Sequence, residues 1–387
     1  MKISKPLFLS VILLIIAFGY YITRGAATIQ AATENTSMQR PALESSASCG
    51  KTNYTLPPTP IAASNDDTPA TSPNKDGPVI ADLGFFIEEI PAINELENTF
   101  TVEGRINVIW CDPRLQYTSN DHEKFKTYLE EQAQTKLQTL WWPDITFANE
   151  VAKRDTADEI LLIHDNGTIE YREKFSVTLE AAYKLIKFPF DNQTLAIEIA
   201  SFNWNNKHLK LDFIKELNGF SAEFEIPEWH ITHTESRVED VMKPGDRATF
   251  SQFLMEIHVT RQFGFYLWKV LLPLVALVLM CFAVFWIREE GLAERLNISF
   301  TGILTVVAYQ FIATDSLPKV PYITLMDAYI NFSFIIMVTT IIQSIIVSRY
   351  NTNNEHDLGL KLDQNSRWIF PLVYLLGIGL LTFVFMA

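Results

Sequence analysis

The chain has 387 residues, of which 48% are apolar, and 45 acidic against 31 basic side chains give it a formal net charge of -14. This length is enough for two sizeable domains. The acidic balance argues against nucleic acid as a partner and against anionic lipid as the main one, and it suits cationic ligands, divalent ions or a cation current. Cys49, Cys111 and Cys281 are widely spaced, so neither a disulfide framework nor a zinc site is predicted from them.

The N-terminal region predicts export. Residues 1–27 contain two lysines, then the apolar run 7–18 and small residues at 25–27, which is the layout of a signal peptide, with an uncleaved anchor as the alternative. Residues 28–78 are rich in Ser, Thr, Pro, Asn and Ala and hold too few large apolar side chains to bury a core. We therefore expect a disordered linker or tail, with Cys49 a free thiol.

Residues 79–262 predict an all-β domain. Short runs of alternating character are separated by turn residues, and Asp165-Asn166-Gly167 is a hairpin signal. This spacing favours an antiparallel sandwich with immunoglobulin-like topology. One helix is expected over 120–140, capped by Asn120 or Asp121. The predicted strands include residues 101–110, 159–163, 168–175, 194–201, 207–213, 228–234 and 250–260.

Residues 263–387 predict a membrane domain of four helices, at about 265–287, 293–314, 322–348 and 367–387. The basic residues of the connections are unevenly distributed, since the second connection has Lys319 alone. The first and third connections carry Arg288, Arg295, Arg349, Lys361 and Arg367. The positive-inside rule therefore puts those two connections in the cytoplasm, and the sandwich and the C-terminus outside. The third connection, 351–366, is too short for a cytoplasmic domain.

The second of these helices carries a polar stripe. Residues spaced by three or four fall on one helical face, and here they are Glu294, Asn297, Thr301, Leu304, Ala308, Phe311 and Asp315. Polar and ionised groups at membrane depth turn toward protein or a water-filled cavity. A ring of such helices would enclose a path with a carboxylate at each mouth and an apolar constriction, which are parts of an ion channel. The alternative is an ordinary helix packed in a bundle.

Several motifs in fixed order carry a resemblance to a known family. They are Phe188-Pro189-Phe190-Asp191-Asn192-Gln193, Trp110-Cys111-Asp112-Pro113-Arg114-Leu115, Trp141-Trp142-Pro143-Asp144 with Phe147 and Asn149, Arg261, Pro273, and Leu317-Pro318-Lys319-Val320-Pro321-Tyr322. On these the chain, from about residue 80 onward, resembles the pentameric ligand-gated ion channels, the Cys-loop receptor superfamily, in its bacterial form. Ala181 and Leu195 stand where animal receptors have the two loop cysteines, so packing must hold that loop. The paired cysteines of the nicotinic capping loop are also absent from 238–250.

The resemblance implies a homopentamer whose second membrane helix lines the pore. Glu294 followed by Arg295 is similar to the pair in cation-selective members, so Glu294 is the expected selectivity residue. Leu304 and Phe311 form the expected gate, because a narrow apolar constriction expels water. In the alternatives, Glu294 pairs with Arg295 or Arg288 and contributes little field, and the two apolar residues pack between helices.

The resemblance also suggests a ligand site and a coupling region. Aligned by spacing, Phe202, Trp204, Phe250 on the capping loop and Arg105 across the subunit boundary would suit a zwitterion, unless the aromatics are core residues and Arg105 is a solvated surface residue. Coupling would join Phe188, Pro189, Phe190 and Asp191 to Pro318, Lys319 and Pro321, with Arg261 as a buried ion-pair partner.

A metal site is a weaker hypothesis. Glu223 and Glu225 alternate on one strand face near Glu228, which could serve a divalent cation or a proton sensor. At strand period His230 and His233 face opposite ways, which argues against their acting together. The agonist, whether a small molecule, a proton or a divalent cation, is not identified by the sequence.

Two other functions compete with a channel. One is a membrane-anchored periplasmic binding or sensor module that does not conduct. The weaker one is an enzyme, because no Ser-His-Asp, metal-ligand or phosphate-loop pattern stands out. No cofactor is expected, and the partners expected are four further copies of the chain, membrane lipid and a ligand. The predicted location is the bacterial inner membrane, with the sandwich in the periplasm.

Overall fold

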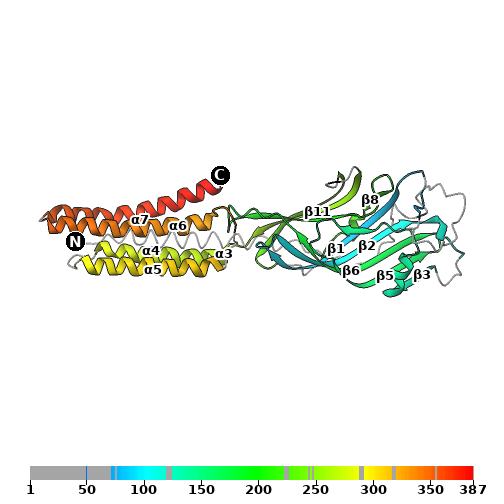
Figure 1. Cartoon of the computed structure of the whole chain (residues 1–387), viewed down its shortest axis with the longest axis horizontal. Coiled ribbons are helices and arrows are strands. Elements are labelled where there is room, and N and C mark those ends of the chain that lie inside the picture. The colour runs from blue at the N-terminus through cyan, green and yellow to red at the C-terminus, as the bar shows by residue number, and fades with distance from the viewer. Residues whose placement is uncertain are drawn as a thin grey trace. The chain divides into compact units, whose positions relative to one another are not determined.

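The computed structural model describes residues 49, 71–74, 76–118, 124–221, 226–242, 245, 248–286, 292–315, 320–353 and 355–386. Strands occupy its first part, up to Arg261, and helices the remainder (Figure 1). The predicted signal peptide and most of the predicted linker lie outside the described residues, and those two expectations stay predictions.

The larger sheet has seven strands, in the order β3-β5-β6-β2-β1-β8, with β9 also paired to β1. Most neighbours are antiparallel, as expected, but β1 pairs with β8 and β9 in parallel. The antiparallel prediction is therefore wrong at this edge, where the chain returns from the other sheet. The strands are β1 (Val79–Asn94), β2 (Thr99–Cys111), β3 (Phe125–Leu129), β5 (Asp155–His164), β6 (Thr168–Glu180), β8 (Leu209–Phe213) and β9 (Gly219–Phe220).

The smaller sheet has four strands, in the order β10-β11-β7-β4. An aromatic cluster joins the two sheets: Phe85 and Phe175 of the larger sheet lie 6.2 and 5.0 Å from Phe147 of the smaller one, centroid to centroid. Phe253 adds a fourth ring, 6.3 Å from Phe85. Offset and edge-on contacts of this kind stabilise a core beyond their buried area. The strands are β4 (Ile145–Phe147), β7 (Asn192–Ser201), β10 (Trp229–Met242) and β11 (Thr249–Arg261).

The hairpin between β5 and β6 forms at the predicted turn. Gly167 has φ +85°, and a Cβ there would lie 2.8 Å from the Asp112 carbonyl oxygen, so a glycine is required for both conformation and space. The motif that begins at Trp110 continues into a short 3-10 helix, η1 (Pro113–Leu115), whose N-cap Asp112 accepts a hydrogen bond from the Arg114 amide. A second such helix is η2 (Lys215–Leu217).

The helix expected over 120–140 is wrong between Phe125 and Leu129, while its predicted caps Asn120 and Asp121 lie outside the described residues. Phe125–Leu129 is β3, which pairs antiparallel with β5, and helix α2 covers only Glu131–Leu137. Glu130 between them has φ +47°, which a continuous right-handed helix does not allow. The spacing of the apolar residues fitted a helix, but cross-strand pairing decided the conformation.

The expectation of a free thiol at Cys49 is also wrong. Cys49 forms a disulfide with Cys111 of β2, with the two Cα atoms 5.0 Å apart. The Thr71 carbonyl oxygen accepts a hydrogen bond from Arg114 Nη1 at 2.9 Å, so both described points of the predicted linker contact the sandwich. The two cysteines are 62 residues apart in sequence, and no spacing rule connects partners at that distance.

The helical part begins directly after β11. Its first segment consists of α3 (Gly264–Tyr266), a π-helical stretch η3 (Leu267–Leu271), α4 (Leu272–Phe282) and a 3-10 turn η4 (Ala283–Trp286). Helices α5 (Leu292–Asp315), α6 (Leu325–Thr352) and α7 (His356–Met386) follow. The predicted third connection, 351–366, is largely helical, because α7 begins at His356, eleven residues before the predicted fourth helix, and holds Asp363 and Ser366 against Gln343 of α6.

Three of the described helical segments are long and apolar enough to cross a membrane: Gly264–Trp286, Leu325–Thr352 and His356–Met386. Helix α5 has 24 residues, a length of about 36 Å at 1.5 Å per residue, which is enough to cross the apolar core of a bilayer.

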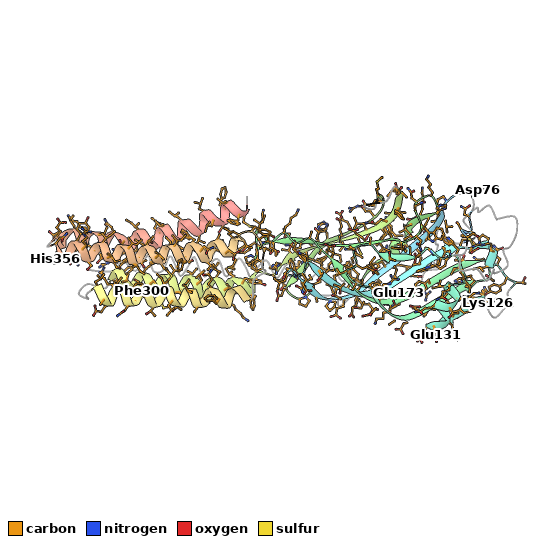
Figure 2. The ribbon with its side chains drawn as sticks, in the orientation of Figure 1. Asp76, Lys126, Glu131, Glu173, Phe300 and His356 are labelled. Atoms are coloured by element: carbon orange, nitrogen blue, oxygen red, sulfur yellow. A yellow bond between two sulfur atoms is a disulfide. The ribbon has the colours of Figure 1, made fainter. Side chains whose placement is uncertain are left out.

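A buried carboxylate in the larger sheet is paired with an arginine. Glu173 of β6 is 2% exposed and accepts hydrogen bonds from Arg154 and from the Tyr171 hydroxyl; Figure 2 labels it among the other side chains of the sheet. Burial of a carboxylate is tolerated when such partners are present. Not every buried polar atom is satisfied in this way, since Glu159 Oε2 and the indole nitrogens of Trp110 and Trp141 have no hydrogen-bond partner among the described residues.

Peptide mapping tests the disulfide. We expect a non-reducing digest to yield one linked peptide pair that contains Cys49 and Cys111, because both are held in the folded domain. Cys281 is 4% exposed, so it should react with iodoacetamide only after denaturation. Alkylation of Cys49 in the native, unreduced protein would contradict the assignment.

Candidate functional site

One face of α5 packs against the other helices. Arg295, Ser299 and Val306 are buried on it. Gly302 lies on the same side, where a Cβ atom would be 2.1 Å from the Cys281 sulfur and 3.2 Å from Met337 Cε. The glycine therefore permits the close approach of α5 to α4 and α6, as small residues do between membrane helices.

The predicted stripe lies on an exposed face of α5. All of its described side chains are exposed, and Leu304 and Phe311 are 70% and 73% exposed. The exposed face is wider than the stripe, since Phe300 (Figure 2), Thr305 and Gln310 also belong to it. Asp315 is the last residue of α5, and its side chain is outside the described part. The exposed stripe consists of Glu294, Asn297, Thr301, Leu304, Ala308 and Phe311.

Arg295 points away from this face. Its guanidinium binds the Asp363 carboxylate of α7 through Nη1 at 3.1 Å and Nη2 at 2.5 Å, and Asp363 also accepts from Gln343 of α6 at 3.0 Å. Two parallel bonds of this kind give a charged pair strong and specific geometry. The described ion pair of Arg295 is thus with Asp363 and not with its neighbour Glu294. Arg288, the other partner considered for Glu294, lies outside the described residues.

A hydrogen bond ties α5 to the first helical segment at the opposite end. Pro273 has no N–H to donate to the Lys269 carbonyl one turn earlier, and the backbone before it is π-helical. The Tyr309 hydroxyl of α5 donates to the Val270 carbonyl at 2.5 Å. The irregular turn therefore exposes a carbonyl that positions α5.

Arg261, the last residue of β11, is the centre of the junction between strands and helices. Its side chain is 1% exposed and lies 2.8 Å from Asp191 through Nε and 2.7 Å from Glu95 through Nη2. Its guanidinium also lies over the rings of Trp229, at 4.2 Å, and Phe188, at 4.8 Å. The prediction that Arg261 is a buried ion-pair partner is confirmed.

This arginine is held in its charged form. Burial by itself would lower the pKa of Arg261, but the hydrogen bonds and charges of Asp191 and Glu95 raise the pKa above its ordinary value. A charge removed from water needs such compensation. The junction is therefore built around a permanent cation with two carboxylates.

The loop before β7 contacts the start of α6. The Leu185 amide donates to the Tyr322 hydroxyl at 3.1 Å, and the Leu325 amide donates to the Ile186 carbonyl at 2.9 Å. Phe190 lies 5.0 Å from Phe263, which precedes α3. The loop thus contacts Tyr322 and the start of α6, but through Leu185 and Ile186, which precede the predicted residues Phe188 to Asp191.

Not all predicted coupling residues take part in those contacts. Pro321 is exposed, whereas Phe188 and Pro189 are buried. Pro318 and Lys319 lie outside the described residues. Glu95 and Trp229 also contact Arg261 but were not predicted. Glu95 lies in the turn between β1 and β2 and Trp229 begins β10, and neither place carries a local pattern that points to Arg261.

The aromatic residues predicted for the ligand site have different environments. Phe202, directly after β7, is 70% exposed. Trp204 packs 5.6 Å from Trp141, and its indole N–H donates to the Trp142 carbonyl at 3.0 Å. Phe202 is therefore presented outward, while Trp204 is held by its own chain.

The placement of Phe250 on a capping loop is wrong. Phe250 is the second residue of β11, within the strand that alternation predicted over 250–260, and it is buried opposite Val241 of β10. Arg105 is exposed and bonds to Glu88 of the neighbouring strand at 2.8 Å, with Phe86 5.3 Å below it. A carboxylate ligand would have to compete with Glu88 for this arginine.

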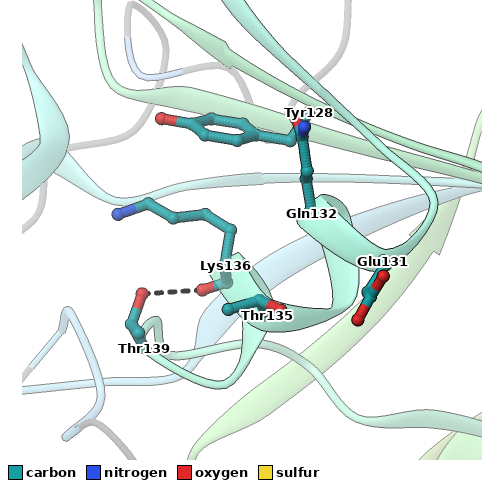
Figure 3. Close-up of a pocket in the computed structure, with 6 residues that line it drawn as sticks. All are labelled: Tyr128, Glu131, Gln132, Thr135, Lys136 and Thr139. Atoms are coloured by element: carbon teal, nitrogen blue, oxygen red, sulfur yellow. Dashed lines mark hydrogen bonds between the residues drawn. The ribbon is translucent and has the colours of Figure 1, made fainter.

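A shallow pocket lies elsewhere, along α2. Figure 3 shows its lining residues, with the Thr139 hydroxyl donating to the Lys136 carbonyl at 2.7 Å. None of the predicted ligand residues lines it. The pocket is lined by Tyr128, Glu131, Gln132, Thr135, Lys136 and Thr139.

The expectation that His230 and His233 face opposite ways is wrong. A β-bulge between Ile231 and His233 shifts the register, so that His230 is opposite Thr260 and His233 is opposite His258. Thr260 and His258 are two residues apart on β11 and share a face. Glu223 and Glu225, the weak metal candidates, lie outside the described residues.

Substitution of Arg261 tests the junction. We expect Arg261→Met to destabilise the protein by about 3–5 kcal/mol, because it leaves the Asp191 carboxylate buried without its partner. Arg237→Met is the matched control: Arg237 also binds two carboxylates, Glu239 and Glu256, but is 44% exposed, and little change is expected. Thermal unfolding of the purified protein, followed by tryptophan fluorescence, measures both. Equal effects of the two variants would refute a special role for Arg261.

Comparison with known proteins agrees with this architecture. Residues 65–263 match the family model described as neurotransmitter-gated ion-channel ligand binding domain, and residues 270–359 match the neurotransmitter-gated ion-channel transmembrane region. The strands and the helical part thus correspond to the two regions of that family.

Two relatives illustrate the range of the family. The chain is 22% identical to a proton-gated ion channel of Gloeobacter violaceus over 314 residues, which cover 81% of this chain and 85% of that protein. It is also 22% identical to the gamma-aminobutyric acid receptor subunit epsilon of Rattus norvegicus over 291 residues, which cover 72% of this chain but 54% of that subunit. The chain belongs to the neurotransmitter-gated ion-channel family, the pentameric Cys-loop receptor superfamily.

Proposed function

We propose that this chain forms a homopentameric, cation-selective channel whose pore is lined by α5 and opened by a ligand bound to the β-sandwich. The observation that carries the proposal is the exposed row on α5, from Glu294 to Phe311. In a membrane, Asn297 and Thr301 on that row need water or protein in place of lipid. Five copies around an axis provide it.

The two faces of α5 support this arrangement. Ser299, Gly302 and Val306 face the chain's own helices, so the opposite face is available to the axis and the flanks to neighbouring copies. The wider exposed surface of α5, which includes Phe300, then packs against the next subunit. The helix thereby serves both its own bundle and the pore.

Charge selectivity would come from Glu294. It lies in the first turn of α5 and is exposed, and its neighbour Arg295 is bound to Asp363. Five such carboxylates around a narrow mouth produce a negative potential that concentrates cations. The bond between Arg295 and Asp363 supports this role, because it turns the arginine away from the carboxylate.

Leu304 and Phe311 would close the pore. They lie two turns apart on the exposed row and are its most exposed large apolar side chains. A ring of such side chains blocks ions by excluding water without closing the gap completely. A small tilt of α5, which is tied to the first segment by Tyr309, would open it.

Ligand binding would reach the gate through the Arg261 junction. A ligand shifts the closed and open states only by its differential affinity for them, and a change from 1:99 to 99:1 needs about 5.5 kcal/mol. Five ligand sites in the pentamer would share this free energy. Phe202 and Arg105, on exposed parts of the sandwich, remain our proposed ligand contacts at a subunit boundary. The channel would lie in a bacterial inner membrane, with the sandwich on the periplasmic side.

Cysteine accessibility tests the lining. Cysteine in place of Thr301, Leu304 or Ala308 should react with a charged methanethiosulfonate reagent during channel opening and reduce the current. Cysteine in place of Val306, which is buried against the other helices, is the matched control and should stay unreactive. A row that stays unreactive in every functional state would overturn the proposal.

Reversal potentials test selectivity and conduction together. Across a tenfold KCl gradient an ideally cation-selective channel reverses at about 59 mV, and Glu294→Gln should move the value toward zero. Glu355→Gln, an exposed carboxylate between α6 and α7, should leave it unchanged. A purified protein that gives no current under any ligand, pH or calcium condition would favour the non-conducting sensor module instead.

A further inference from the structure

On the outer face of the smaller sheet, a threonine and two histidines form a row across three neighbouring strands. Thr194 of β7 pairs with His258 of β11, and His258 pairs with His233 of β10. The two imidazole rings stack with centroids 4.1 Å apart and planes 12° from parallel. Glu235, two residues after His233 on the same strand, adds a carboxylate 3.7 Å from His233 Nε2.

We propose that His233, Glu235 and His258 bind a Zn²⁺ ion that bridges β10 and β11. One ligand atom from each of the three residues lies within 4.8 Å of the others. Zinc bonds of 2.0–2.2 Å require separations of about 3.3 Å in a tetrahedron. His233 and Glu235 are exposed and His258 is half-buried, so ion binding would rotate mainly the His233 and Glu235 side chains and turn the His233 ring out of its parallel stack; a water molecule takes the fourth position.

The hydrogen bonds around the two histidines leave the required nitrogens available. The Thr232 hydroxyl donates to the His258 carbonyl at 2.9 Å, so its oxygen can only accept from His233 Nδ1, 3.4 Å away. Thr194 Oγ1 lies 3.0 Å from His258 Nδ1. In both rings the hydroxyl contact is at Nδ1, which leaves Nε2 for a metal. Such partners orient metal-binding histidines.

The β-bulge gives the cluster its geometry. Without the extra residue at Thr232, His233 would point to the opposite face of β10 and could not meet His258. The bulged residue is also the one whose hydroxyl fixes the His233 ring. Bulges often redirect a side chain toward a functional position.

The donor set selects the class of ion. Two imidazoles and one carboxylate suit zinc and other late first-row divalent metals, whereas Ca²⁺ and Mg²⁺ require mostly oxygen ligands. A bound ion would cross-link the two strands three residues before Arg261.

Titration calorimetry with ZnCl₂ on the full, tag-free protein in detergent tests the site. We expect one Zn²⁺ per chain, at least tenfold weaker binding in His233→Ala and in His258→Ala, and no binding of MgCl₂. His356→Ala removes an exposed histidine at the start of α7 and should bind as the unmodified protein does. Thr232→Val keeps the ligands but removes the orienting hydroxyl, and a roughly tenfold loss is expected.

Hydrogen exchange provides the second measurement. Saturating Zn²⁺ should slow amide exchange in peptides from β10 and β11 and leave β5 and β6 unchanged, since the ion joins the first two strands. Absence of zinc binding, or equal binding in a His233→Ala/His258→Ala double variant that elutes as the unmodified assembly does, would overturn the proposal. Neither measurement needs ion conduction, so this result is independent of the proposed channel activity.

Discussion

The buried guanidinium of Arg261 is the constraint on which the junction of strands and helices depends. It brings together a turn of the larger sheet through Glu95, the loop before β7 through Asp191, and the start of β10 through Trp229. A buried charge tolerates little displacement, because a shift that separates it from its carboxylates exposes the full desolvation penalty. These segments therefore hold fixed positions relative to the last residue of the strand that leads into the first membrane segment.

The helical part also contains a buried arginine that is paired with a carboxylate. Arg295, Asp363 and Gln343 connect α5, α7 and α6 through buried hydrogen bonds, while Gly302 lets α5 approach α4 and α6 closely. Both devices act on the buried face of α5. Because the charge of Arg295 is paired on the buried face, the carboxylate of Glu294 stays on the exposed polar face, which is the side proposed for the pore.

The outer surface of the smaller sheet adds a feature that is independent of the junction. There a single bulge at Thr232 brings His233 opposite His258, on the same two strands that end near Arg261. Because the proposed metal site lies on the solvent side and Arg261 on the core side of β11, one strand would connect the two. That strand pairs with β7 on one side and with β10 on the other.

Much of the architecture followed from local pattern. Alternation and the Asn-Gly turn located β2, β5, β6, β7, β10 and β11, and long apolar runs located the helices, because burial selects residues at the periods of strand and helix. The family resemblance predicted Arg261 as a buried ion-pair residue, but it did not identify Asp191 as the partner. Local pattern failed where the deciding contact was distant: β3 was taken for helix and the start of α7 for a connection. The placement of Phe250 on a capping loop came from the family resemblance, whereas alternation had placed Phe250 in a strand.

The amino-acid sequence by itself determined the order of a β-domain and a helical membrane domain, the family, and the stripe on α5. All three follow from the periodicity of apolar residues and from motifs a few residues long. Only the tertiary structure decided that Cys49 bonds to Cys111, that Glu95 and Trp229 join Arg261, and that Arg295 turns to Asp363. It also decided that His233 meets His258. The physical reason is the same in each case: side chains far apart in the chain meet only after packing and register have been set, and one residue of strand register reverses the face on which a side chain lies.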